Sequence, residues 1–124
     1  MEKLTPKIWN ALFTCDSYDA VAQQIPTANP RIHKWAGLHV ISHYPISDNN
    51  FWFIREAIDY RFCLLIFELD EHTLKYFSET GGDEVQNPVF YKFNTEDELY
   101  KVCEEQKIEP SKFVPPWQAN YPFE

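Results

Sequence analysis

Two acidic residues at the end of an apolar run are the best-placed candidates for chemistry. Glu68 and Asp70 follow the apolar residues 62–67 and are two residues apart. That spacing places both carboxyl groups on one face of a β-strand, where a pair of carboxylates could act as general acid and base. A strand that leaves a core also becomes polar for structural reasons alone. We therefore favour a structural role and keep a small enzyme as the alternative.

The histidines and cysteines form no recognisable pattern for a metal or a nucleophile. His33, His39 and His43 lie close together, but no acidic residue lies between them and no cysteine accompanies them. A metal site usually needs three or four ligands at supporting spacing. The cysteines are widely spaced and include no Cys-x-x-Cys pair: Cys15, Cys63 and Cys103. We expect no catalytic residue and no bound metal.

Nucleotide and calcium sites are disfavoured by the few glycines. Gly37, Gly81 and Gly82 are the only ones, and no Gly-x-Gly-x-x-Gly or Gly-Lys-Ser/Thr pattern occurs. Asp83 and Glu84 follow two of them, but the alternating oxygen ligands and terminal glutamate of an EF-hand loop are absent. We therefore expect no cofactor.

The net charge of −8 lies wholly in the C-terminal half of the chain. Residues 1–67 carry six acidic and six basic residues, whereas residues 68–124 carry 13 acidic residues against five lysines and no arginine. Nucleic acid and anionic membranes are disfavoured as partners, since both are bound by clustered Lys and Arg. A basic protein is favoured, although acidic surfaces also serve solubility alone.

A docking surface for such a partner would combine acidic residues with neighbouring tyrosines. Complementary charge speeds association, and tyrosines are frequent binding hot spots. The predicted partner-binding residues lie on the last helix and around the 79–84 loop: Glu79, Asp83, Glu84, Glu96, Asp97, Glu104, Glu105, Tyr76, Tyr91 and Tyr100.

The N-terminal half predicts two helices and a strand. Thr5-Pro6 is a good start for a first helix. A second helix is expected from residue 16 or 17 to about 24, because Tyr18, Val21 and Ile25 recur at helical spacing. Residues 38–44 predict a strand. Residues 51–60 fit a helix or a strand.

The C-terminal half predicts two strands and a helix. Residues 62–69 form the best strand, and their continuous apolar character suggests burial on both faces. Residues 72–78 fit a helix or the second strand of a hairpin, and residues 89–93 predict a strand. Thr95 and Glu98 form a capping-box pattern that begins the last helix, which Pro110 ends.

These elements predict one α+β domain spanning residues 1–124. We expect N-terminal helices, a mostly antiparallel sheet and a C-terminal helix packed on the sheet. An α/β alternation is the alternative, if both ambiguous segments are helices. The tail of residues 111–124 is rich in proline and aromatic residues, so we expect it to pack on the body. No targeting segment or membrane-length apolar run is visible, so the cytoplasm is the expected compartment.

The whole profile resembles the small acidic immunity proteins of bacterial toxin systems, including those of contact-dependent growth inhibition. The resemblance rests on size, acidity and the absence of catalytic motifs, so it assigns no contact residue. It implies a non-catalytic cytoplasmic protein whose partner is a basic toxin nuclease. The implied mechanism is occlusion of the nuclease active site, with carboxylates in the place of phosphates. The alternative is a small enzyme or ligand-binding domain with an aromatic pocket.

Overall fold

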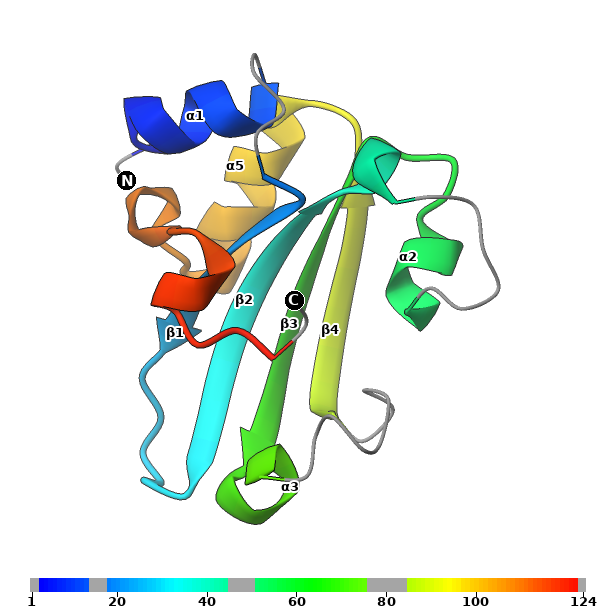
Figure 1. Cartoon of the computed structure of the whole chain (residues 1–124). Coiled ribbons are helices and arrows are strands. Elements are labelled where there is room, and N and C mark those ends of the chain that lie inside the picture. Colours follow the sequence, from blue (N-terminus) through cyan, green and yellow to red (C-terminus); the bar gives the residue numbers. More distant parts are fainter. Residues whose placement is uncertain (1–2, 14–17, 45–50, 76–84, 123–124) are drawn as a thin grey trace.

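The computed structural model describes residues 3–13, 18–44, 51–75 and 85–122. These residues form one antiparallel sheet in which each strand lies beside its neighbour in sequence (Figure 1). Its strands are β1 (Ala20–Ile25), β2 (Ile32–Val40), β3 (Phe62–Asp70) and β4 (Gln86–Phe93). The helices are α1 (Pro6–Phe13), α2 (Trp52–Glu56), α3 (Glu71–Lys75) and α5 (Glu96–Gln106), with 3-10 turns at η1 (Ile41–His43), η2 (Pro110–Lys112) and η3 (Pro116–Gln118).

The order of the elements confirms the predicted α+β class, because α1 precedes the sheet and α5 follows it. The alternative α/β alternation depended on helices in segments 51–60 and 72–78. Helices α2 and α3 do lie partly in these segments, but each has only five residues. A parallel neighbour needs a crossover of a dozen or more residues, usually a full helix. These single turns therefore leave the strands antiparallel.

The second predicted N-terminal helix is wrong, because residues 20–25 form strand β1 and pair with β2. Tyr18, Val21 and Ile25 do recur at helical spacing. However, the first four residues of β1 are all buried, since both faces of the sheet are covered here. A strand covered on both faces lacks the alternation that distinguishes it from a helix in sequence.

Strand β2 begins earlier and ends earlier than the predicted strand 38–44. It runs from Ile32 to Val40, and η1 follows at once. The first residues of β2 include the polar His33 and Lys34, so the sequence pattern did not indicate a strand there. Strand β4 likewise begins at Gln86 rather than Val89. Strand β3 agrees with the prediction, and its residues 62–67 are all buried.

The sheet separates two hydrophobic layers. On one face, which we call the helical face, α1 and α5 pack through Ile8, Leu12, Leu99 and Cys103 against the sheet. On the opposite face, α2 packs with the end of the chain over β2 and β3. Two covered faces explain why β3 is apolar without alternation.

Helix α5 has the start that the sequence predicted. The Thr95 side chain accepts a hydrogen bond from the backbone N–H of Glu98 at 3.2 Å, and its hydroxyl donates to the Glu98 carboxylate at 3.1 Å. The helix ends at Lys107, whose φ of 58° lies in the left-handed region. Both ends are therefore defined by local interactions.

The end of the chain crosses the sheet on the face opposite α1 and α5 (Figure 1). We call residues 114–122 the C-terminal strap. Val114 pairs with Ala22 of β1 through two backbone hydrogen bonds of 2.9 Å. Beyond it, Ala119 and Tyr121 are buried in the layer that contains Trp35 of β2. The strap thus completes the core on this face.

Candidate functional site

The outer face of α5 presents acidic residues on a rigid element. Leu99 and Cys103 point into the core and are fully buried. Five exposed residues lie on the opposite side of the helix, and all except Lys101 are acidic: Asp97, Glu98, Lys101, Glu104 and Glu105. We call these five residues the α5 acidic face. Its single lysine lies three or four residues from each acid, which is within reach on a helix.

The predicted partner-binding residues divide between this face and other places. Asp97, Glu104 and Glu105 belong to the α5 acidic face. Glu96 is half-buried and accepts a hydrogen bond from the Trp9 indole N–H of α1, which fixes its carboxylate. Four of the predicted residues lie outside the described residues: Tyr76, Glu79, Asp83 and Glu84.

Tyr91 of β4 and Tyr100 of α5, two of the predicted partner-binding residues, are half-buried and contact other residues of the chain. The Tyr91 hydroxyl of β4 accepts a hydrogen bond from the Gln106 side chain. The Tyr100 ring lies 5.6 Å from the Lys3 ammonium. They border the α5 acidic face on its two sides, toward β4 and toward the N-terminus. Neither ring is freely exposed.

The acidic residues at the two ends of α5 differ in their effect on the helix. Glu96, Asp97 and Glu98 lie in the first turn, where the partial positive charge of the helix dipole favours carboxylates. Glu104 and Glu105 lie near the opposite end, where the dipole disfavours them. The last turn contains no basic residue, and the next cation is the C-cap residue Lys107. The helix dipole therefore favours the first group and opposes the second, which lies within reach of Lys101 alone among the cations of the helix.

A shallow groove of about 260 Å³ separates α5 from the edge strand β4. Its lining contains the aromatic residues Tyr91 and Phe93 together with two carboxylates and two ammonium groups: Glu98, Glu105, Lys92 and Lys101. These four charges balance. The groove shares Glu98, Lys101 and Glu105 with the α5 acidic face, and Lys92 of β4 balances their charge. The acids of that face outside the groove are Asp97 and Glu104.

Of the two carboxylates considered for catalysis, Asp70 has a structural role. The register places Glu68 and Asp70 on one face of β3, as their spacing predicted. However, an Asp70 oxygen accepts the backbone N–H of Thr73 at 2.7 Å, so this residue caps the short helix α3. That hydrogen bond also lowers the pKa of the Asp70 carboxyl group. An ionised capping carboxylate is a poor general acid.

His39 is fully buried between two phenols on the face covered by the strap. Its Nδ1 lies 3.1 Å from the Tyr44 hydroxyl and its Nε2 lies 2.8 Å from the Tyr121 hydroxyl. Burial lowers the pKa of His39 to about 3, so the ring is neutral. One ring nitrogen then donates and the other accepts. Burial also raises the pKa of both phenols.

Sequence reasoning did not identify this cluster, because its members are distant in the chain. His39 and Tyr121 are 82 residues apart. The only local signal was a histidine placed between Leu38 and Val40 in an apolar strand, which is typical of a buried and satisfied side chain. Both nitrogens of His39 are occupied, so it is not available as a metal ligand.

The other histidines do not complete a metal site. His43 lies 2.9 Å from the exposed Asp19 carboxylate, and the His33 ring stacks on Trp35 at 5.9 Å. Within the described residues, no group of three or more His, Cys, Asp and Glu side chains could hold a metal ion.

Two of the cysteines are core residues. Cys63 and Cys103 are free thiols and fully buried. Burial raises the pKa of Cys63 strongly and that of Cys103 to about 12. Such thiols are poor nucleophiles near neutral pH. Cys15 lies outside the described residues.

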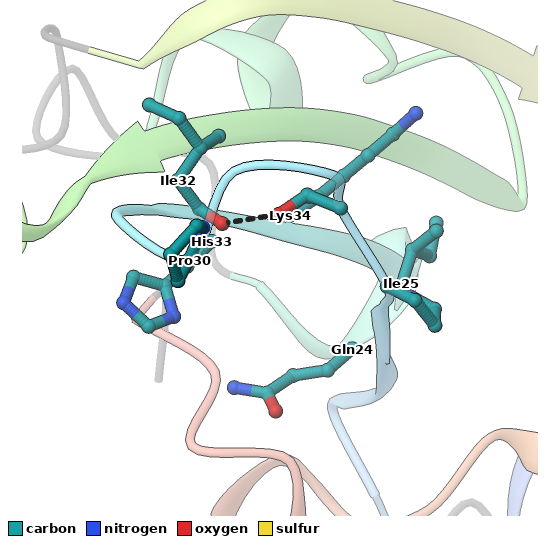
Figure 2. A pocket seen from close by; sticks show the side chains of 8 residues that line it. Gln24, Ile25, Pro30, Ile32, His33 and Lys34 are labelled. Carbon is teal, nitrogen blue, oxygen red and sulfur yellow. Dashed lines mark hydrogen bonds between the residues drawn. The ribbon is translucent and has the colours of Figure 1, made fainter.

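A second hollow of about 220 Å³ lies at the hairpin between β1 and β2 (Figure 2). The Thr27 hydroxyl lies 2.7 Å from the carbonyl oxygens of Asn29 and Ile32 and donates to one of them, which closes the turn. Figure 2 shows His33 and Lys34 pointing in different directions, as successive strand residues must. Their polar groups therefore do not converge on one ligand.

Comparison of the chain with protein-family models, with curated proteins and with solved structures found no match in any of the three. In the part of the chain that the structure describes, no helix has the length and apolar character needed to cross a membrane.

Proposed function

We propose that this chain is a non-catalytic binding protein that recognises a basic protein through the α5 acidic face. The observation that carries the proposal is the position of Glu104 and Glu105. Both are exposed near the negative end of the α5 dipole, with no basic residue in the last turn. The helix dipole makes these two carboxylates unfavourable for the stability of α5. Their presence is therefore better explained by binding to a partner than by folding.

The resemblance to acidic immunity proteins supplies the most specific form of this proposal. The partner would be a basic toxin nuclease, and the protein would act in the bacterial cytoplasm. The α5 acidic face would cover the positively charged nucleic-acid site, and its carboxylates would replace phosphates. Clustered Lys and Arg bind phosphates through charge, so the same cluster would attract this helix.

The runner-up, a small enzyme or ligand-binding domain, has weaker support. Asp70 caps α3 and His39 is bonded on both nitrogens. The groove beside β4 is shallow and carries balanced charge. We therefore favour binding over catalysis.

The direct test is to express the product of the gene next to this one and to measure its binding and its nuclease activity. The proposal predicts a basic product whose nuclease activity is lost at a one-to-one ratio with this protein. It also predicts that binding weakens as the salt concentration rises. A neighbouring product that is neither basic nor bound, or a complex whose nuclease remains fully active, would overturn the proposal in this form.

A further inference from the structure

The C-terminal strap is attached to the sheet mainly by side chains. After the pairing of Val114 with Ala22, the backbone hydrogen bonds of the described residues 115–122 run within the strap itself: Gln118 to Pro115, and Ala119 and Tyr121 to Pro116. Two side-chain hydrogen bonds then tie it to β2. The Trp35 indole N–H donates to the Ala119 carbonyl oxygen at 2.8 Å, and Tyr121 bonds His39. Detaching residues 115–122 would therefore break no backbone hydrogen bond between strands of the sheet.

The strap inserts the ring of Tyr121 into a narrow slot on the sheet. The Tyr121 ring is buried and lies 5.8 Å from the Phe67 ring and 5.6 Å from the His39 ring. The floor of the slot is Gly37, where even a Cβ atom would overlap the Tyr121 side chain. The hydroxyl group reaches His39 at the end of the slot. The contact between Tyr121 and His39 is therefore a polar contact at the tip of the strap within an apolar layer.

Among the residues that the structure describes, the groups that face His39 come from several elements, and none of them carries a charge. Tyr44 follows η1, Tyr121 belongs to the strap, Cys63 is its partner on β3 and Phe53 belongs to α2. Its partner on β1 is Ala20. Asp19, which precedes the β1 partner Ala20, is exposed, and its carboxylate lies 2.9 Å from the His43 ring. A protonated His39 would thus lack a contacting counter-ion among the described residues.

We propose that residues 115–122 of the C-terminal strap detach from the sheet when His39 is protonated, while the pairing of Val114 with Ala22, the sheet and its helices stay in place. Because a buried charge without a counter-ion is costly, the protonated ring must reach water. Displacing the strap exposes His39 and breaks only the contacts of the strap with the sheet. Unfolding the sheet would instead disrupt both hydrophobic layers. Release uncovers an aromatic floor that includes Trp35 and Phe67.

The expected dependence on pH follows from the two environments of His39. Its pKa is about 3 under the closed strap and would be near 6.5 once exposed to water. Between these values, each unit decrease in pH favours the open state about tenfold. A fall in pH through this range therefore promotes release, and a return to neutral pH reverses it.

The test is nuclear magnetic resonance of the full chain between pH 7 and pH 4. The indole N–H of Trp35 and the amide of Tyr121 should lose their protection from solvent exchange as the pH falls, while the amides of Leu64 and Leu65 in β3 keep theirs. His39→Gln should abolish the transition, because glutamine does not titrate. His33→Gln, which removes a nearby histidine that stacks on Trp35, should leave the midpoint unchanged.

Two outcomes would overturn the proposal. One is simultaneous loss of protection in the strap and in β3, which means global unfolding. The other is an unchanged transition in His39→Gln. If that variant does not fold, Tyr121→Phe keeps the ring and removes the bond to His39. The midpoint should then move to higher pH, and an unchanged midpoint would also contradict the proposal.

Discussion

The Tyr121 side chain occupies the space where a side chain at position 37 would begin. A Cβ atom built on Gly37 would lie 1.9 Å from the phenolic oxygen and 2.2 Å from the Cζ atom of Tyr121. The glycine is therefore required by the close approach of the strap rather than by its own backbone conformation. A residue in the middle of β2 and a residue near the chain terminus thus depend on each other.

Gly37→Ala should displace Tyr121 and weaken its bond to His39. Because the clash is with a ring held in a packed layer, we expect the free energy of unfolding to fall by about 1–3 kcal/mol. Urea denaturation of the two proteins measures this difference. In a Tyr121→Ala background the same glycine substitution should cost little, since the ring is gone. An equal cost in both backgrounds would show that the two residues are not coupled.

Acid should destabilise the protein before its carboxyl groups titrate. The His39 pKa is about 3 in the folded chain and near 6.5 when unfolded. Between these values the unfolded state binds a proton that the folded state does not. This contribution to stability is therefore complete above about pH 6.5 and is lost as the pH falls towards 3.

Linkage gives a free energy of unfolding about 2 kcal/mol lower at pH 5 than at pH 8, as long as the strap stays closed. Denaturation at both pH values measures it. His39→Gln should remove most of the difference. Stability that is equal at the two pH values in the unmodified protein would refute the assignment of His39 as a buried neutral residue.

Neutralising the acids at the end of α5 should stabilise the helix. We expect Glu104→Gln and Glu105→Gln each to raise the free energy of unfolding by about 0.3–1 kcal/mol, because they remove charges that oppose the helix dipole. Asp97→Asn, in the first turn of the same helix, is the matched control and should lower stability. Thermal denaturation at low salt compares the three variants. Destabilisation by both glutamine variants would mean that these carboxylates serve the fold.

The sequence was most informative where structure is local. The Thr95 cap and the apolar spacing of Leu99 and Cys103 depend on residues within one helix, and both predicted α5. The continuous burial of β3 was likewise visible in its composition. Strand β1 was mistaken for a helix, because coverage of both faces removed the alternation that would have identified it.

The candidate site was only partly predictable. Asp97, Glu104 and Glu105 lie on the exposed side of α5 as their spacing implied. The sequence could not reveal that the Trp9 indole binds Glu96, or that Tyr121 reaches His39 across the sheet. Both contacts join residues more than 80 positions apart. Such contacts arise from the tertiary fold and leave no local pattern.

In the proposed function, partner binding depends on the position of the acids on α5 and not merely on net charge. The measurement is the association rate with the basic product of the neighbouring gene, by stopped flow at low and high salt. The variant Glu104→Lys with Glu105→Lys is compared with Glu56→Lys and Asp59→Lys, which make the same charge change at exposed positions in and just after α2. Helix α2 lies on the opposite face of the sheet.

We predict that the α5 reversal slows association at low salt by tenfold or more, within the range of about 10–1,000-fold expected of electrostatic steering. The α2 reversal should slow it much less, and high salt should reduce the difference. Equal slowing by both variants, or unchanged rates in the α5 variant, would contradict recognition of the partner through the α5 acidic face.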